Sequence, residues 1–412
     1  MESNQLIPHL FRTEFSKIVS VLCKTYGFSN IQWAEDIVSD TFLTATETWR
    51  LKGFPENATA WLYRVAKNKA IDQLRRDNNF QQKIQPDLQK KETTEELQEI
   101  DLSDHNIQDS QLRMFFAICN PVIKPKAQIA LALRILCGFN AQEIANAFLS
   151  NKETINKRIH RAKATIKKEQ IQFDLPSPSE IRERLEEVIS ILYLLFNEGY
   201  YSTSTDKNLR KELCVEAMRL NLLLLDSPLT NTPELNALMA LFCFHASRFE
   251  ARSDKSGKQI LYHEQDRSLW DGELIQKGEY FLGQSHSSQK VGKIHLEALI
   301  AFWHAQTTDL ENKWENILSA YNQLLQLEYS PVVALNRTYA LAKVKGNEVA
   351  IEEALKIDLS DHHLFHMLLA ELYTPNNKIK AESHFKQALE LVKNENEKLF
   401  ILKKLEDLTS QD

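Results

Sequence analysis

The chain has 412 residues and a formal net charge of −6 at pH 7, with 43% hydrophobic and 26% charged residues. These values exclude a disordered chain, and the length predicts two to four domains because one hydrophobic core rarely serves so many residues. Only 10 glycines and 11 prolines are present, which favours helices joined by short loops. We therefore expect an all-α fold.

The N-terminal segment and the apolar runs indicate the cellular compartment of the protein. Residues 1–9 lack the basic and apolar regions of a signal peptide, and the apolar run 222–225 is far shorter than a membrane span. The five cysteines are odd in number and none has C-x-x-C spacing, which is typical of buried reduced thiols. We expect a cytoplasmic protein with no membrane partner.

Charge is distributed unevenly along the chain. Residues 1–85 carry 11 Lys/Arg and 9 Asp/Glu, and residues 86–110 carry 2 and 8. Residues 111–172 carry 11 and 3, whereas residues 173–412 carry 26 and 36. A compact basic block beside an acidic body predicts a polyanionic partner for that block alone.

Two segments divide the chain into three helical domains. Residues 86–110 are polar and acid-rich and sustain no apolar stripe, which predicts a linker. Two prolines at positions 176 and 178 interrupt a helical pattern. The predicted domains are therefore 1–85, 111–172 and 177–412.

The first domain contains two predicted helices separated by a loop. Apolar residues recur at helical spacing over 34–50 and again from about 59 to 77. The intervening residues 51–57 include Gly53 and Pro55 and are read as a loop. Basic residues line the second of these helices outside its apolar stripe.

The second domain predicts a helix-turn-helix. A helix is expected to end at Gly138, a short amphipathic helix spans 141–148, and Ser150 with Glu153 forms a capping box that starts the next helix. In that helix Ile155, Ile159, Ala162 and Ile166 form the stripe expected to be buried. Seven basic residues and Glu153 lie within 152–168, as expected for a helix that offers polar groups to base edges and cations to phosphates.

Three stretches together resemble bacterial sigma factors. Residues 34–42, AEDIVSDTF, resemble the polymerase-binding helix of these factors. Residues 61–76, WLYRVAKNKAIDQLRR, resemble the adjacent helix that engages the −10 promoter element. Glu143-Ile144-Ala145 with residues 154–162, TINKRIHRA, is similar to the region that reads the −35 element.

The order of these stretches and the acidic linker between them resemble the extracytoplasmic-function sigma factors over residues 6–172. Two departures from the pattern stand out. Ser39 lies where many relatives have Gln, and Asn151-Lys152 replaces a small residue often found before Thr154. The second departure bears on which promoter sequence is read.

The resemblance implies two partners, promoter DNA and the beta-prime clamp helices of core RNA polymerase, and assigns site residues. The expected polymerase contacts are Glu35, Asp36, Asp40, Phe42 and Trp49, of which Phe42 and Trp49 can equally be core residues. Phe54 and Asn68 are expected to hold an unstacked −10 base, and the expected phosphate contacts around it are Arg64, Lys67, Lys69, Arg75 and Arg76. The residues expected at the −35 element are Lys152, Glu153, Asn156, Lys157, Arg158, His160 and Arg161.

The 240 residues beyond position 172 form a long extension. Its stretches LYLLFNEGYY at 192–201, EQDR at 264–267, LWD at 269–271 and VVALNR at 332–337 resemble the sigma factors that carry a large helical C-terminal extension. From about residue 310, helical hairpins resemble tetratricopeptide repeats, since Ala381, Phe385 and Ala388 match the small–aromatic–small positions of the second repeat helix. We expect this acidic extension to regulate the sigma domains, within the chain or through a regulatory protein or small ligand.

Other classes of function find less support in the sequence. His362, His363 and His366 lie near one another without an H-E-x-x-H pattern, so packing or surface exposure explains them better than a metal site. The run Glu264–Arg267 lacks an accompanying nucleophile or phosphate loop, and we expect no cofactor, no metal and no enzymatic activity. The alternative reading is a one-component helix-turn-helix regulator that senses a ligand in its C-terminal domain.

Overall fold

The computed structural model describes residues 3–84, 100–147, 150–201, 207–252, 260, 262–286, 291–308, 310–392 and 395–409. Over these ranges the chain forms helices and no strands, so the all-α prediction is confirmed. The chain divides into two compact units, Met1–Asn231 and Thr232–Asp412. No helix among the described residues is both long enough and apolar enough to cross a membrane.

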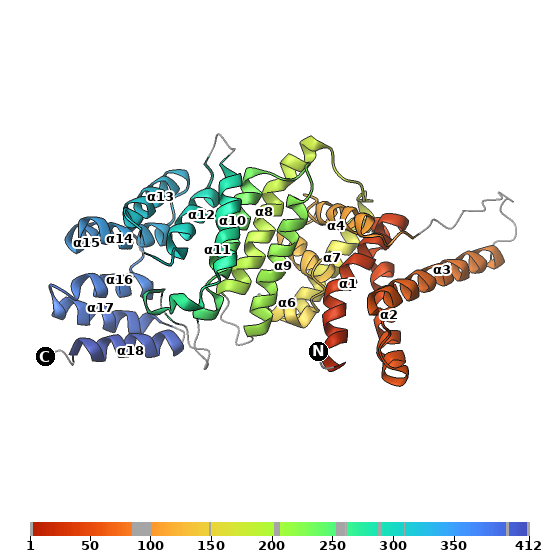
Figure 1. Cartoon of the computed structure of the whole chain (residues 1–412), viewed down its shortest axis with the longest axis horizontal. Coiled ribbons are helices and arrows are strands. Elements are labelled where there is room, and N and C mark those ends of the chain that lie inside the picture. The colour runs from red at the N-terminus through yellow and green to blue at the C-terminus, as the bar shows by residue number, and fades with distance from the viewer. Residues whose placement is uncertain are drawn as a thin grey trace. The chain divides into compact units, whose positions relative to one another are not determined.

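Three groups of helices make up the first unit (Figure 1). The first group is α1 (Ser3–Tyr26), the 3-10 turn η1 (Phe28–Asn30), α2 (Ile31–Lys52) and α3 (Ala58–Ile84). The second is α4 (Asp104–Ile118), α5 (Pro125–Ile135), α6 (Ala141–Ala147) and α7 (Lys152–Lys168). The third is the pair α8 (Pro178–Tyr201) and α9 (Lys207–Leu225).

Helix α4 lies at the centre of the first unit. It packs against α1, α5, α8 and α9, and six successive residues from Met114 to Cys119 are buried. The second half of α4 is therefore covered on every side, whereas Asp104, His105 and Gln108 in its first half are exposed. Since α4 begins at Asp104, the linker predicted over 86–110 is wrong in its last part, and residues 85–99 lie outside the described residues.

The predicted boundary between residues 172 and 177 also differs from the structure. Helices α8 and α9 belong to the first unit, and the second unit begins at Thr232. Thr232 caps the next helix by accepting a hydrogen bond from the backbone N–H of Leu235, and Pro233 occupies the first turn. The two prolines at 176 and 178 end a loop without ending a domain, because α4 and α5 both pack against α8.

The second unit begins with α10 (Pro233–Ala246), whose residues are buried almost throughout. Gly278 of α11 (Gly272–Ser285) lets this helix approach α10 closely, because a Cβ atom at Gly278 would lie 2.6 Å from Cε1 of Phe244. Among the described residues between α10 and α11 lie the 3-10 turns η2 (Phe249–Ala251), η3 (Tyr262–Glu264) and η4 (Arg267–Leu269).

Further along the second unit, each helix packs on the next (Figure 1). These helices are α12 (Lys293–Ala305), α13 (Lys313–Leu327), α14 (Pro331–Lys345), α15 (Asn347–Ala354), α16 (His363–Tyr373), α17 (Lys378–Leu391) and α18 (Glu395–Thr409). Ala381, Phe385 and Ala388 are buried in the core that α17 shares with α16 and α18. Helices that bury their faces only against neighbours form a quasi-linear stack, and tetratricopeptide repeats are one such stack. The tetratricopeptide-like assignment of these helices stays a prediction.

Candidate nucleic-acid interface

Helix α7 starts at a polar cap that differs from the predicted one. Asn151 is the N-cap, and its side-chain oxygen accepts a hydrogen bond of 2.7 Å from the backbone N–H of Thr154. The backbone N–H of Ser150 instead donates to the carbonyl of Ala145 at 2.8 Å. The capping box predicted for Ser150 is therefore wrong. Asn is as good an N-cap as Ser, so the start of the helix is unchanged.

The outer face of α7 carries the residues expected at the −35 element. The predicted stripe Ile155, Ile159, Ala162 and Ile166 is buried, and α7 packs on α5 and α6. On the opposite face, six of the seven predicted residues are exposed and the seventh, Arg158, is half-buried; the six are Lys152, Glu153, Asn156, Lys157, His160 and Arg161. Lys157 and Glu153 form an ion pair of 2.6 Å with both side chains mostly exposed, so either is free to exchange its partner for DNA.

Helix α2 divides the predicted polymerase contacts between two faces. Asp36 and Asp40 are exposed, whereas Glu35, Phe42 and Trp49 are buried. The exposed face also carries Leu43, which is 57% exposed, and Glu47. Positions 36, 40, 43 and 47 follow helical spacing, and this spacing is the signal by which Leu43 and Glu47 could have been found from the sequence.

Glu35 is held inside the first unit by two cations. The carboxylate accepts a hydrogen bond of 3.0 Å from Nε of Arg134 on α5 and pairs with Nζ of Lys163 on α7. Its side chain is only 3% exposed. Burial raises the pKa of the neighbouring Cys23 thiol, and the negative charge of Glu35 raises it further. The prediction that Glu35 contacts polymerase is therefore not met in this arrangement, because a buried, doubly paired carboxylate is closed to a partner.

Three aromatic rings gather where α2 leads into α3. The ring of Trp49 lies 5.3 Å from that of Phe54 and 5.2 Å from that of Trp61. Phe54 is 40% exposed, and Nε1 of the buried Trp49 has no hydrogen-bond partner among the described residues. Exposed aromatic faces suit the stacking of an unpaired base. The sequence predicted Phe54 for this role, assigned Trp49 to polymerase or to the core, and did not single out Trp61.

Helix α3 presents basic side chains with different surroundings. Arg64, Asn68, Arg75 and Arg76 are exposed, and Lys67 and Lys69 are half-buried. Nζ of Lys69 lies 2.5 Å from a carboxylate oxygen of Asp40 on α2. A residue expected to meet DNA thus pairs with one expected to meet polymerase, so the two predicted surfaces adjoin on α2 and α3.

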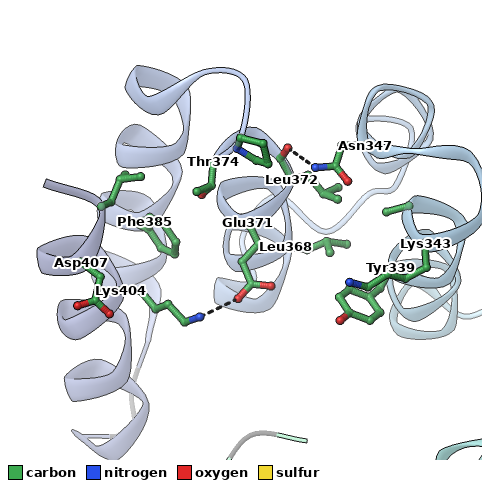
Figure 2. A pocket seen from close by; sticks show the side chains of 13 residues that line it. Tyr339, Lys343, Asn347, Leu368, Glu371, Leu372, Thr374, Phe385, Lys404 and Asp407 are labelled. Carbon is green, nitrogen blue, oxygen red and sulfur yellow. Dashed lines mark hydrogen bonds and ion pairs between the residues drawn. The ribbon is translucent and has the colours of Figure 1, made fainter. Parts of the chain in front are cut away.

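The second unit contains a groove of about 650 Å³ among α14 to α18. Figure 2 shows Tyr339 and Lys343 of α14 on one wall, Lys404 and Asp407 of α18 on the other, and Glu371 of α16 between them. Glu371 and Lys404 form an ion pair of 3.7 Å. The groove is of the size that small-molecule sites occupy, and its walls mix both signs of charge.

Two parts of the chain match known protein families. Residues 11–80, which span most of α1, all of α2 and most of α3, match the family described as Sigma-70 region 2. Residues 184–286, from α8 to α11, match a family of unknown function, DUF6596. The Rhizobium meliloti (strain 1021) protein "Uncharacterized protein R00370" is 34% identical over 394 residues, covering 93% of this chain and 92% of that protein. No solved structure matches the chain. The chain therefore belongs to one family with the Rhizobium protein, and its residues 11–80 form a Sigma-70 region 2 domain.

Proposed function

We propose that the chain directs core RNA polymerase to specific promoters as a sigma factor of the extracytoplasmic-function type. The supporting observation is the Sigma-70 region 2 match over residues 11–80. Within it, the exposed face of α2 is acidic with Leu43 at its centre, and the exposed face of α3 is basic. Such faces suit a protein partner and a phosphate backbone respectively. The sigma-70 family consists of transcription factors, which supports the absence of an enzymatic role.

The −35 element is assigned to α7. Its exposed face offers the amide of Asn156 and the cation of Lys157 in the N-terminal half of the helix, and the cation of Arg161 just beyond it. Side chains in the first turns of a recognition helix reach base edges in the major groove, and the flanking cations meet phosphates. The −10 element is assigned to the Trp49–Phe54–Trp61 cluster and to the exposed side chains of α3.

Transcription in vitro tests this function. Purified full-length chain and core polymerase are incubated with a promoter library, and the start sites of the transcripts are mapped. Promoter-specific transcripts that require both proteins support the proposal. Phe54→Ala should reduce open-complex formation more than duplex binding, whereas Leu229→Ala, at an exposed position remote from α2, α3 and α7 in the sequence, serves as the control. Absence of any promoter-specific transcript contradicts the proposal.

A second candidate is a one-component regulator that senses a ligand. The observation in its favour is the groove between α14 and α18, whose volume of about 650 Å³ fits a small molecule. Such a regulator binds its operator without polymerase. Specific duplex binding at physiological salt by the chain alone, with no effect of polymerase on strand opening, would favour this candidate over the first.

We further propose that the extension acts partly by supporting the sigma helices. Helices α8 and α9 pack on α4, and the guanidinium of Arg219 on α9 donates a 2.9 Å hydrogen bond to the carbonyl of Leu136. Six of the seven predicted −35 residues nevertheless remain exposed in the unit that contains α8 and α9. This part of the extension therefore supports the −35 helix without covering its reading face.

A further inference from the structure

The groove between α14 and α18 lies wholly within the second unit and has an apolar lining between its charged walls. Its volume is about 650 Å³. Four of its lining residues are apolar and at most 9% exposed, namely Leu368, Leu372, Phe385 and Leu408. The part of a ligand that meets these side chains must itself be apolar, because a polar group there would lose its water without gaining a hydrogen bond.

Two charged side chains of the groove have no ion-pair partner among the described residues. They are Lys343, whose Nζ lies 5.3 Å from the centroid of the Tyr339 ring, and Asp407. The other two charged residues, Glu371 and Lys404, pair with each other at 3.7 Å. Figure 2 shows Lys343 and Asp407 on opposite walls with Glu371 between them. The groove therefore presents a positive charge on its α14 wall and a negative charge on its α18 wall.

Helix stability accounts for one of these two charges and not for the other. Lys343 lies in the last turn of α14, where the negative end of the helix dipole favours a cation. Asp407 lies in the last turn of α18, where the same dipole disfavours a carboxylate. Helix α18 thus gains nothing from Asp407, whereas a cationic group bound in the groove would.

The two charges lie too far apart for a single α-amino acid. Helix α16 lies between the two walls (Figure 2), and packed helices are about 8–10 Å apart, so the axes of α14 and α18 are roughly 16–20 Å apart. The side chains of Lys343 and Asp407 shorten this gap from both sides. An extended chain advances about 3.3–3.6 Å per residue, so three or four residues, roughly 10–14 Å long, fill what is left.

Asn347 adds a hydrogen-bonding group that suits a peptide backbone. Its side-chain N–H group donates a 3.0 Å hydrogen bond to the carbonyl of Leu372, drawn in Figure 2, which holds the amide in place at the edge of the groove. Its side-chain oxygen is an acceptor. A peptide N–H group that leaves water needs such an acceptor. The groove thus offers a peptide one cation, one anion, one acceptor and an apolar lining.

We infer that the groove binds a short peptide of three or four residues with free termini and an apolar central residue. The terminal ammonium group pairs with Asp407 on α18, the terminal carboxylate pairs with Lys343 on α14, and the central side chain meets the apolar lining. The lining carries two lysines, one glutamate and one aspartate, so its net charge of zero suits a zwitterion and disfavours a polyanion such as a nucleotide. This inference goes beyond the sigma function and does not rest on it, because binding is measured with the chain alone.

Calorimetric titration of the full-length chain tests the inference. The first probe is alanyl-leucyl-alanine, and three further tripeptides carry glycine, valine or phenylalanine at the centre. We expect a dissociation constant of about 0.01–1 mM for the leucyl peptide, as is usual for a ligand of about 19 non-hydrogen atoms. Acetylation of its amine and amidation of its carboxylate should each weaken binding roughly fivefold, because each removes one partly exposed ion pair.

Two variants assign each terminus of the peptide to its wall. In Lys343→Met, amidation of the peptide should cause no further loss, and in Asp407→Asn, acetylation should cause none. Each variant should bind the unmodified tripeptide roughly fivefold more weakly than wild type. Lys345→Met is the matched control, because Lys345 lies in the same last turn of α14 but outside the lining of the groove. It should bind every form of the peptide as wild type does.

Three results would overturn the inference. The first is that none of the four tripeptides binds. The second is that free leucine binds as tightly as alanyl-leucyl-alanine, since a single amino acid cannot reach both walls. The third is that amidation weakens binding to Lys343→Met as much as to wild type. Lys343 and Asp407 are both exposed, so their variants should keep the fold, and the modified peptides test wild type without any variant. A failure of transcription with core polymerase would overturn the sigma function and leave this inference standing.

Discussion

The carboxylate of Glu35 and the ammonium group of Lys163 form an ion pair between residues 128 positions apart in the sequence. Their side chains are 3% and 14% exposed. A buried pair is a poor source of net stability, yet removal of one partner leaves an uncompensated charge. The pair therefore contributes mainly to the specificity of helix packing and little to net stability.

A double-mutant cycle should show strong coupling between these two residues. Glu35→Gln, Lys163→Gln and the double variant are compared by urea unfolding of the full chain. We expect a coupling free energy of about 1–3 kcal/mol, because the two groups are in contact and shielded from water. The Glu153–Lys157 pair on α7 has side chains 77% and 62% exposed and should couple by less than about 0.5 kcal/mol. Equal coupling in both cycles would contradict the structural role of the Glu35–Lys163 pair.

The exposed face of α7 should separate base contacts from phosphate contacts. Asn156→Ala or Lys157→Ala should relax preference at one or two −35 positions, at about 1–3 kcal/mol for each good base contact. Arg161→Ala should instead weaken binding to every sequence and reduce the salt slope by roughly one. Binding to a panel of −35 duplexes at several salt concentrations measures both effects. A uniform loss for Asn156→Ala and Lys157→Ala alike would show that α7 does not read bases at these positions.

The all-α class could be predicted from the sequence because apolar spacing and scarce glycine are local signals. Exposure of the −35 residues followed from the same spacing on α7. Glu35 was assigned to polymerase by its place in the family resemblance, but in this structure it shares the buried stripe of α2 with Ile31 and Val38. Its partners Arg134 and Lys163 lie about 100 residues away or more along the chain. Pairings over such separations give no signal in the local sequence.

The boundary between the two units also could not be predicted from the sequence. Prolines at 176 and 178 are a strong local sign of a break, but a domain boundary depends on which surfaces are covered. Helix α9 touches the turn at Leu136 through Arg219, a contact between residues 83 positions apart. The division between the two compact units falls at Thr232, which carries only an ordinary helix cap.

Truncation should therefore tolerate a stop after Asn231 and not one after residue 172. Burial raises the pKa of the thiols of Cys119 and Cys137, with smaller effects from charged side chains on α8 and α9 respectively. We expect both thiols to be unreactive toward a disulfide reagent at pH 8 in chain 1–231. In chain 1–172 they should react rapidly, because α8 and α9 no longer cover them. Slow reaction in both truncations would restore the boundary at 172.

Gly278 offers a test of packing in the second unit. Gly278→Ala should destabilise this unit by about 1–3 kcal/mol, since the added methyl group would lie 2.6 Å from the ring of Phe244. Gly283 lies on the same helix with nothing within 4 Å of its added Cβ. Gly283→Ala should therefore be neutral or stabilising by up to about 1 kcal/mol. Thermal unfolding of both variants measures the difference, and equal effects would argue against the close approach of α10 and α11.

His304 should make the second unit less stable in acid. Burial, followed by the positive charges of Arg248 and Lys313, lowers the pKa of His304 from 6.5 to about 3. Between these two pH values the unfolded chain binds a proton at this position that the folded chain does not, so the free energy of unfolding falls as the pH drops from about 6.5 toward 3. Burial, followed by the positive charges of Arg248 and Arg252, also lowers the pKa of His245 and adds to the slope. His304→Gln should make unfolding of this unit less dependent on pH in that window, as measured by urea midpoints from pH 7 to pH 4. His160→Gln, at an exposed position on α7, is the matched control. If neither His304→Gln nor His160→Gln changes the slope of the unfolding free energy against pH, His304 takes up its proton in the folded state.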